Sequence, residues 1–550
     1  MHGIDAVIQS LFGPISDTLS AIVFFEIPIF GGVPIIVLWL MAAAIFLTVW
    51  LRFQPLTGFR HSIDVIRGRF TARTDPGQVS SFEALATELS GTVGLGKISG
   101  VAVAIATGGP GAALWIALFG FFAMSVKMAE ATLGVMFRRI DEDGTTVGGP
   151  MYYLRDGLAA IGWTRTGKVL GVLYAIFALV GVFGAGNLFQ ANQVAAIVAN
   201  ATGSQFLEGN SWLIGLILAI VAGVVILGGV TSIARFTSRI TPAMAVLYVV
   251  CTLSVIVVNI THIPDAVVAI VSGAFTGAGV TGGAIGVAVI GIQRALFSNA
   301  AGVGSAGMAH SASKTKSPAT EGYTAMWEPF VDSIVVCMLT ALAITVTGVY
   351  EQGAGDGSDS VGVALTSSAF GTVASWFPIL LTVAVVLFGF STILSYAYYG
   401  ELAAQYLFGK KQGVRTAFRV VWVLAVIVGA AISLKAVIDF SDAMFFLMAI
   451  PNLLGIYILS RLVRLEILRH RTRVDVGTLS PVDEELRVGM GSHEPTPEQV
   501  EAAEAAEREE AAEVARVREV LADDPDFPVR ADHHDDDLAS PMGRPAEPIA

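Results

Sequence analysis

The stretch "GTVGLGKISG", residues 91–100, places four glycines and a lysine, Lys97, inside an otherwise apolar segment. The hydrocarbon region of a bilayer offers no water to unpaired backbone N–H and C=O groups. A glycine-rich interruption of a membrane helix is therefore tolerated only where it faces protein or a water-filled cavity. If the chain is a membrane protein, this stretch predicts a helix that is broken at an internal site.

The composition indicates a membrane protein. Of the 550 residues 54% are hydrophobic and 14% are charged, and the mean hydropathy is +0.69. Soluble domains are roughly 45–50% apolar and about 25% charged. The apolar runs are long enough for helices that cross the bilayer and lack the short alternation of a barrel strand. We expect an all-α polytopic protein of the cell membrane. No basic segment precedes an early apolar run, so a cleaved secretory signal is not expected.

Hydropathy predicts about eleven spans. They lie near residues 33–51, 83–106, 112–137, 168–199, 212–231, 240–260, 264–297 with a break, 321–349, 373–400, 416–437 and 441–465. The loops alternate in charge: Arg and Lys gather near 52–73, 138–155, 235–239, 314–316, 410–415 and 461–473, whereas the opposite loops hold acids or no charge. Because Lys and Arg favour the cytoplasmic side, the amino terminus is predicted outside and the carboxyl tail inside.

The net charge of −12 belongs to the tail. Residues 471–550 hold 8 Arg, no Lys and 21 Asp plus Glu. Such a segment buries too little apolar surface to offset the entropy of the chain, so it is predicted to be largely disordered. A capping pattern at Thr496, Pro497 and Gln499 indicates one possible solvated helix over 497–521. The predicted organisation is a leading helix and loop in 1–74, a ten-helix core in 75–470 and this cytoplasmic tail.

A second glycine-rich interruption supports an inverted repeat. When the leading helix is set aside, ten predicted helices remain, in two sets of five. "GAFTGAGVTGGAIG" begins at Gly273, in the first helix of the second set. Paired breaks in corresponding helices are typical of transporters whose site lies near the midplane. The half-helix ends at such breaks direct N–H groups at an anion and carbonyl groups at a cation, an arrangement that suits a zwitterion.

Six segments resemble the signatures of the alanine or glycine:cation symporter family. They are "FEALATELSGTVGLGKISGVAVAIATGGPGAALWI", "KMAEATLGVMFR", "DGTTVGGPMYYL", "GNLFQANQV", "RALFSNAAGVGSAG" and "FSTILSYAYYGE", in chain order between about residues 30 and 465. The resemblance implies a LeuT-type 5+5 inverted repeat with one extra N-terminal transmembrane helix. It also implies secondary active transport of small neutral amino acids driven by sodium.

The resemblance also implies a set of site residues. Thr92, Gly94 and Gly96 would lie beside the substrate carboxylate, and Gln190, Thr392 and Tyr396 would form the wall of the pocket. Carbonyl groups of Ser90 and Val93 with the hydroxyls of Ser391 and Thr392 would form a sodium site. Position alone, in the second break, adds Phe275 and Thr276 to the predicted substrate contacts.

The chain departs from the family pattern at three positions. The family usually has Asn where Lys97 stands, Glu where Ala300 stands and Trp where Tyr396 stands. Since the Asn helps to hold a sodium ion in related transporters, Lys97 either replaces one sodium as a fixed positive charge or, through a pKa lowered by burial, couples transport to protons. A third interpretation makes Lys97 a structural pin that reaches a carbonyl or carboxylate. Direct pairing with Glu88, nine positions earlier on the helix, is not expected.

The sequence thus predicts a symporter of alanine, glycine or another small neutral amino acid, coupled to sodium and possibly to protons, with no cofactor. An alternative is a channel or an amino-acid-sensing receptor. An enzyme is not expected, since no nucleophile and base constellation occurs in the spans, and neither is a nucleic-acid partner. Lys127 and Glu130, spaced i and i+3, are predicted to pair, and Asp332 and Glu401 are interpreted as structural.

Overall fold

The computed structural model describes residues 33–92, 94–140, 145–276, 282–353 and 362–477, together with 14, 17–27, 479, 481, 482 and 487. Within these residues the strands form two short antiparallel pairs, β1 (Glu26–Ile27) with β2 (Val33–Pro34) and β3 (Arg139–Ile140) with β4 (Thr146–Val147). The rest of the regular structure is helical. The predicted tail helix over 497–521 lies outside the described residues.

The first half of the chain holds α2 (Ile35–Trp50), α3 (Gln54–Thr57), α4 (Phe59–Ile66), α5 (Ser81–Thr92), η2 (Leu95–Lys97), α6 (Ser99–Gly108), α7 (Ala112–Met136), α8 (Pro150–Tyr152), η3 (Tyr153–Gly157), α9 (Leu158–Ala160), α10 (Thr164–Phe183), η4 (Gly184–Leu188), α11 (Phe189–Thr202), α12 (Gln205–Gly209), α13 (Trp212–Ile226) and α14 (Gly229–Val258). The second half holds η5 (Ile260–His262), α15 (Ile263–Thr276), α16 (Gly283–Asn299), α17 (Ser305–His310), α18 (Pro318–Ala325), α19 (Trp327–Pro329), η6 (Phe330–Cys337), α20 (Met338–Thr347), α21 (Val349–Gly353), α22 (Gly362–Gly371), α23 (Pro378–Phe408), α24 (Gln412–Ala431) and α25 (Leu434–Asp475). Segments η2 and η5 are 3-10 turns, whereas η3, η4 and η6 are π-helical.

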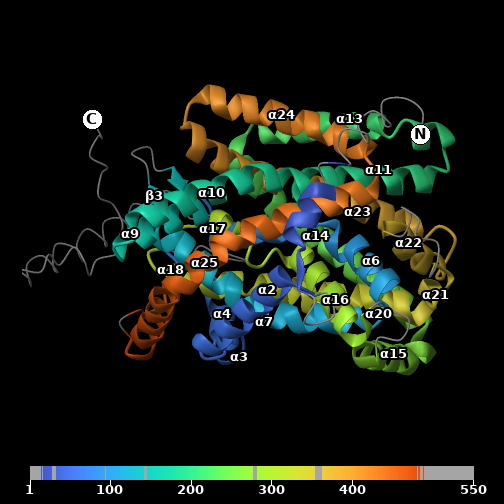
Figure 1. The fold of residues 1–550 in the computed structure, drawn as a ribbon, viewed down its shortest axis with the longest axis horizontal. Helices are drawn as coiled ribbons and strands as arrows, with labels where there is room; N and C mark the ends of the chain where they lie inside the picture. The colour runs from blue at the N-terminus through green and yellow to red at the C-terminus, as the bar shows by residue number, and fades with distance from the viewer. Residues whose placement is uncertain are drawn as a thin grey trace, which may run out of the picture.

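Seven helices in the described part of the chain are long and apolar enough to cross a membrane, and the bent pair formed by α5 and η2–α6 makes eight. The other three predicted spans coincide with shorter apolar helices: α2, α13 and the pair α15 and α16. Helices α10, α11, α13, α23 and α24 run roughly along the long axis of the molecule in Figure 1. The count of eleven stays a prediction, whereas the many apolar helices agree with the predicted architecture.

The first predicted break is present. Helix α5 and the following η2–α6 segment meet at a bend of 53°. Val93, one of the residues predicted to hold sodium, lies outside the described residues. Helix α5 packs against α14 and α23, and η2 packs against α16, so the broken helix lies inside the bundle.

The predicted interruption of the span 264–297 is present, since α15 ends at Thr276 and α16 begins at Gly283, with residues 277–281 outside the described residues. The residues before it do not lie at the first break. The backbone of Gly273 and Ala274 packs against Gly111, and the next residue, Phe275, is 65% exposed. The break near η2 instead follows the end of α16, where the chain turns at residues 300–304 before α17 begins. Ala300, Gly302 and Gly304 there have φ values of 48°, 90° and 93°, a left-handed conformation that glycine adopts without steric cost.

Candidate substrate and ion site

The backbone of the first break touches two other helices. The N–H of Leu95 donates to Oε1 of Gln190 on α11 at 3.2 Å. A Cβ atom on Gly94 would lie 2.6 Å from Oγ1 of Thr392 on α23 and 3.1 Å from Oε1 of Gln190. No side chain fits there without displacing a neighbour, so glycine allows the unwound backbone to approach both helices.

Oxygen atoms of α5 and α23 converge beside this break. Thr392 Oγ1 donates to the carbonyl of Ser90 at 2.8 Å, and Ser90 Oγ donates to the carbonyl of Ser391 at 3.0 Å. Ser395 Oγ donates to Ser90 Oγ at 3.0 Å. All four residues are buried. The structure thus brings together three of the residues predicted to hold sodium, through the carbonyl of Ser90, the hydroxyl of Thr392 and the carbonyl of Ser391, which are uncharged hard oxygens of the kind that suits such an ion. The hydroxyl of Ser391, which was the predicted ligand, instead donates to the carbonyl of Phe388 in its own helix at 2.9 Å.

Ser395 was not among the predicted residues. It lies four positions after Ser391 on α23, so the helical period places both on one face. The spacing in "FSTILSYAYYGE" therefore contained the signal for it.

Tyr396 fits closely between two glycines. A Cβ atom on Gly91 would lie 3.2 Å from its ring, and one on Gly186, in the π-helical segment η4, would overlap the base of the ring. The ring also stacks on Phe445 of α25, with centroids 6.2 Å apart and planes inclined by 20°. Tyr396 therefore joins the broken helix to η4 and α25.

Lys97 forms a buried ion pair. Its Nζ atom contacts the carboxylate of Asp332 in η6, and the two side chains are 1% and 0% exposed. Ser298, near the end of α16, donates from Oγ to Oδ2 of Asp332 at 2.8 Å. Asp332 was interpreted only as structural, and the sequence did not indicate its partner. The pair connects the first break, the helix before the second break and the π-helical η6.

The second break is held by a carboxylate. Glu130 on α7 accepts at Oε1 from the N–H groups of Gly302 and Gly304, at 2.9 and 3.0 Å, and from Nδ2 of Asn452 at 2.9 Å. The predicted pair of Lys127 with Glu130 is wrong. Although the two residues share a helix face, Lys127 contacts other carboxylates, and Oε1 of Glu130 accepts from backbone amides that only the folded chain supplies.

Lys127 is the centre of a second buried ion cluster. Its Nζ atom lies 2.7 Å from Glu88 Oε1 and 2.9 Å from Glu328 Oε2, and all three side chains are fully buried. Glu88 also accepts from Ser305 Oγ at 2.6 Å and from the hydroxyl of Tyr399 at 2.5 Å. The cluster therefore connects α5, α7, α17, α19 and α23. As predicted, Glu88 does not pair with Lys97.

The fold is similar to that of a solved structure with a bound amino acid. MhsT in complex with L-phenylalanine matches with a TM-score of 0.52 at 14% identity, over 68% of this chain and 88% of that chain. The match supports the predicted LeuT-type fold and nothing finer. The model of the sodium:alanine symporter family matches residues 17–483.

The chain belongs to the sodium:alanine symporter family.

Relatives within this family include the sodium/alanine symporter AgcS of Methanococcus maripaludis, 38% identical over 78% of this chain and 92% of its own length. The amino-acid carrier protein AlsT of Bacillus subtilis is 32% identical over 76% of this chain and 86% of its own length. Membership confirms the predicted sodium-coupled amino acid symport. It does not support the alternative of a channel or receptor.

Four predicted substrate contacts of this family member remain to be placed. Thr92 is the last residue of α5, at the edge of the break, and its Oγ1 donates to the carbonyl of Glu88 in the same helix at 3.0 Å. A Cβ atom on Gly96 would lie 3.2 Å from Cα of Ser298, which places it at the contact with α16. Phe275 and Thr276 are exposed, and Phe275 packs edge-on against Trp115. The structure does not bring these last two residues to the other predicted contacts.

Proposed function

We propose that the protein carries alanine, glycine or a similarly small neutral amino acid inward across the cell membrane together with sodium. The observation that carries the proposal is the convergence of Ser90, Ser391 and Thr392 beside the unwound backbone at Gly94. In a LeuT-type transporter a break of this kind presents N–H groups to the substrate carboxylate and carbonyl groups to the ion. Gln190 and Tyr396 stand at the same break and form the wall of the pocket.

The sodium site is tested by uptake of labelled alanine into proteoliposomes at graded sodium concentrations. Thr392→Val keeps the shape of the side chain and removes the hydroxyl, so it is expected to raise the half-saturating sodium concentration by about tenfold, as for the loss of roughly 1.4 kcal/mol of binding energy. Thr382→Val is the matched control, since Thr382 lies on the same helix and bonds only to Pro378 of its own first turn. Equal sodium dependence of the two variants would refute the assignment.

Lys97 is proposed to act as a tethered cation in place of one sodium. Asp332 supports this role because it gives the ammonium group a buried counter-ion, with Ser298 as a further oxygen beside it. The competing interpretations are proton coupling by Lys97 and a purely structural pin of Lys97 to the carboxylate of Asp332. Uptake by Lys97→Asn that equals wild-type uptake under both sodium and proton gradients would leave only the structural pin. Lys97→Asn removes the fixed charge and restores the residue usual in the family, so uptake is expected to depend on one additional sodium. If instead a proton gradient drives wild-type uptake and Lys97→Asn abolishes that drive, the proton interpretation holds.

The size of the substrate is proposed to be set partly by Tyr396. Its ring already fills the space against Gly186 and Gly91, and tyrosine is smaller than the tryptophan usual at this position. We expect tolerance for substrates slightly larger than alanine, and Tyr396→Trp to reduce it. Competition with labelled alanine tests this: if alanine and glycine fail to compete while large amino acids succeed, the small-substrate proposal is wrong.

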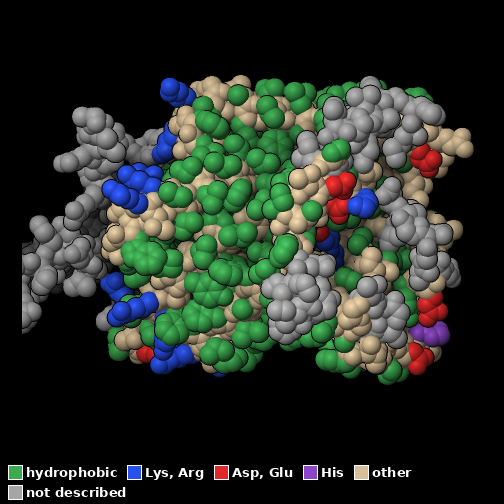
Figure 2. Space-filling model, in the orientation of Figure 1, with side chains coloured by type: hydrophobic (Ala, Val, Ile, Leu, Met, Phe, Trp, Pro, Cys, Tyr) green, Lys and Arg blue, Asp and Glu red, His purple; other side chains and the backbone are tan. Residues whose placement is uncertain are grey.

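The orientation is also a proposal, with the amino terminus outside and the tail inside. On the face shown in Figure 2, most Lys and Arg side chains gather at one end, and most Asp, Glu and His side chains lie toward the other. Both cysteines, Cys251 and Cys337, are buried, so a cysteine introduced at the exposed Lys410 can be labelled selectively. Labelling by an impermeant reagent in intact cells would reverse the proposed orientation.

A further inference from the structure

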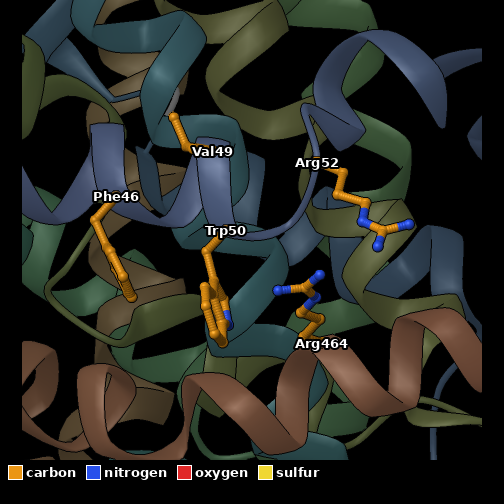
Figure 3. A pocket seen from close by; sticks show the side chains of 5 residues that line it. All are labelled: Phe46, Val49, Trp50, Arg52 and Arg464. Atoms are coloured by element: carbon orange, nitrogen blue, oxygen red, sulfur yellow. The ribbon is translucent and has the colours of Figure 1, made fainter.

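A pocket outside the transport site lies between the leading helix and the last long helix. It has a volume of about 480 Å³ and is lined by Phe46, Val49 and Trp50 of α2, by Arg52, which follows that helix, and by Arg464 of α25. Figure 3 shows Phe46 and Trp50 extending from α2 toward α25, with both guanidinium groups beyond Trp50 on the side away from Phe46. One end of the pocket is therefore apolar and the other is cationic.

The arrangement of the aromatic groups is well defined. Trp50 donates from Nε1 to the carbonyl of Ser460 on α25 at 3.1 Å, which fixes the indole between the two helices. The guanidinium of Arg464 stacks over the indole at 4.6 Å from the ring centroid, and Phe46 stacks on the other side at 5.8 Å. Stacking uses the face of a guanidinium and leaves the N–H donors at its edge available. Trp50 thus holds Arg464 in place without using its donors.

The positive charge in the pocket is not neutralised by any carboxylate in the described part of the chain. Among the residues that the structure describes, neither Arg52 nor Arg464 forms an ion pair with a carboxylate. Two guanidinium groups beside one space favour a bound anion, and their donor geometry suits phosphate oxygens.

The apolar end of the pocket continues along the exposed face of α2. Ile35, Leu38, Ile45 and Val49 are all more than 40% exposed and recur at helical spacing, so they share one face that ends at the pocket. In a membrane helix this face contacts acyl chains, and tryptophan and arginine at its end are typical of the headgroup level. The ligand therefore needs an anionic phosphate and an attached hydrocarbon chain.

We propose that this pocket binds the headgroup of an anionic phospholipid, whose acyl chain lies along the α2 face from Val49 toward Ile45. Basic pockets between transmembrane helices are a known way of recognising such headgroups. A zwitterionic phospholipid offers the same phosphate, but its own cation competes with the two arginines. The pocket is accordingly selective for anionic lipid and independent of the transport site.

The test is native mass spectrometry of the purified full-length protein in detergent with equimolar phosphatidylglycerol and phosphatidylcholine. The wild type is expected to retain phosphatidylglycerol preferentially, and Arg52→Gln with Arg464→Gln to weaken that binding by about tenfold or more. The control is Arg60→Gln with Arg461→Gln, which removes two exposed charges from α4 and α25 outside the pocket. Alanine uptake by both double variants reports that each is folded.

Three outcomes overturn the proposal. The first is equal retention of phosphatidylglycerol by the pocket variant and the wild type. The second is a loss of phosphatidylglycerol in the control variant as large as in the pocket variant, which would mean that positive charge elsewhere on this part of the protein binds the lipid equally well. The third is displacement of the lipid by millimolar inorganic phosphate, which would identify a site for free phosphate. Weaker binding in the pocket variant alone, insensitive to phosphate, supports it.

Discussion

Lys97→Met is expected to destabilise the protein strongly, and Asp332→Asn in the same chain to reverse most of the loss. In the single variant Asp332 stays fully buried and keeps only the hydrogen bond from Ser298 at 2.8 Å. Removing one partner of a buried ion pair costs about 3–5 kcal/mol, because the other charge stays buried without compensation. In the double variant no charge is left, and the Asn side-chain carbonyl can still accept the bond from Ser298.

The magnitude of the coupling follows from the same argument. Asp332→Asn alone leaves Lys97 buried without its partner, so each single variant is expected to cost about 3–5 kcal/mol. The double variant is expected to lie within about 1 kcal/mol of the wild type, so the interaction energy between the two positions is at least about 5 kcal/mol. The matched control is the pair of Lys435 and Asp439, which has a similar contact at 2.6 Å but a lysine that is 73% exposed. Exposed pairs are worth about 0–1 kcal/mol, and the corresponding cycle should show a coupling in that range.

The assay is unfolding in mixed micelles of increasing SDS fraction, followed by tryptophan fluorescence, with choline chloride as the only salt. Sodium is then added, because a lone carboxylate at position 332 should attract a cation and Lys97→Met should gain more stability from sodium than the wild type gains. A sodium concentration of 100 times Kd would contribute about 2.7 kcal/mol. If Lys97→Met unfolds like the wild type, or if the two substitutions simply add, Lys97 and Asp332 do not form the pair on which the tethered-cation proposal rests.

Three further predictions concern other parts of the structure. Gly94→Ala should lower alanine uptake by about tenfold, because a Cβ atom 2.6 Å from Thr392 Oγ1 pushes the break and α23 apart at a cost of roughly 1–3 kcal/mol. Gly209→Ala is the control and should leave uptake unchanged, since a Cβ atom there would have no neighbouring atom within 4 Å. Glu130→Ala should lower the thermal midpoint more than Glu130→Gln, since only the amide keeps an acceptor for the second break; equal midpoints would refute that role. Burial lowers the pKa of His61, so below about pH 6.5 the unfolded chain binds a proton that the folded chain resists, and the free energy of unfolding decreases as the pH is lowered. His61→Gln should therefore weaken the dependence of the thermal midpoint on pH between about pH 6.5 and 5. An unchanged dependence would contradict this.

The parts of the site that could be predicted from sequence are those carried by local pattern. The glycines of "GTVGLGKISG" indicate an unwound backbone by themselves, and the bend of 53° lies there. Ser391 and Thr392 are adjacent on one helix, so once the family motif identified that helix their positions followed together. The contact of Gln190 with the break depended on the resemblance, because nothing in its own surroundings indicates a partner on α5.

The parts that could not be predicted depend on which helices meet. Lys127 could pair with Glu130 on its own helix or with carboxylates from elsewhere, and the sequence offers only the first choice. The folded chain brings Glu88 and Glu328 to it from other helices, while the turn after α16 offers Glu130 two amide donors. For the same reason Asp332 was not recognised as the partner of Lys97.

The position of the second break shows that glycine content alone is a poor guide to an internal break. The sequence places the break in the stretch from Gly273, because its six glycines in 14 residues stand in the first helix of the second set of five. Glycine in a membrane protein also serves close packing, as where Gly111 meets the backbone of Gly273 and Ala274. What distinguishes the turn after α16 is a ligand for its amides. Glu130 accepts hydrogen bonds from N–H groups that lipid cannot satisfy. An internal break therefore requires a polar partner on a neighbouring helix, and carboxylates in the membrane-spanning segments are the first candidates for that partner.

The two ion clusters limit how the half-helix α5 can move during transport. Parting Glu88 from Lys127 would leave a buried charge without its partner at a cost of about 3–5 kcal/mol, whereas one charge crossing 100 mV supplies only about 2.3 kcal/mol. The membrane potential acting on a single sodium ion is therefore too small to move α5 away from Lys127 while water is excluded from the cluster. Either α5 moves together with Lys127 and α7, or water and ions enter as the pair separates. Because Tyr399 and Ser305 also hold Glu88, the second course requires the turn after α16 and helix α23 to loosen in the same step, which links both breaks to one conformational change.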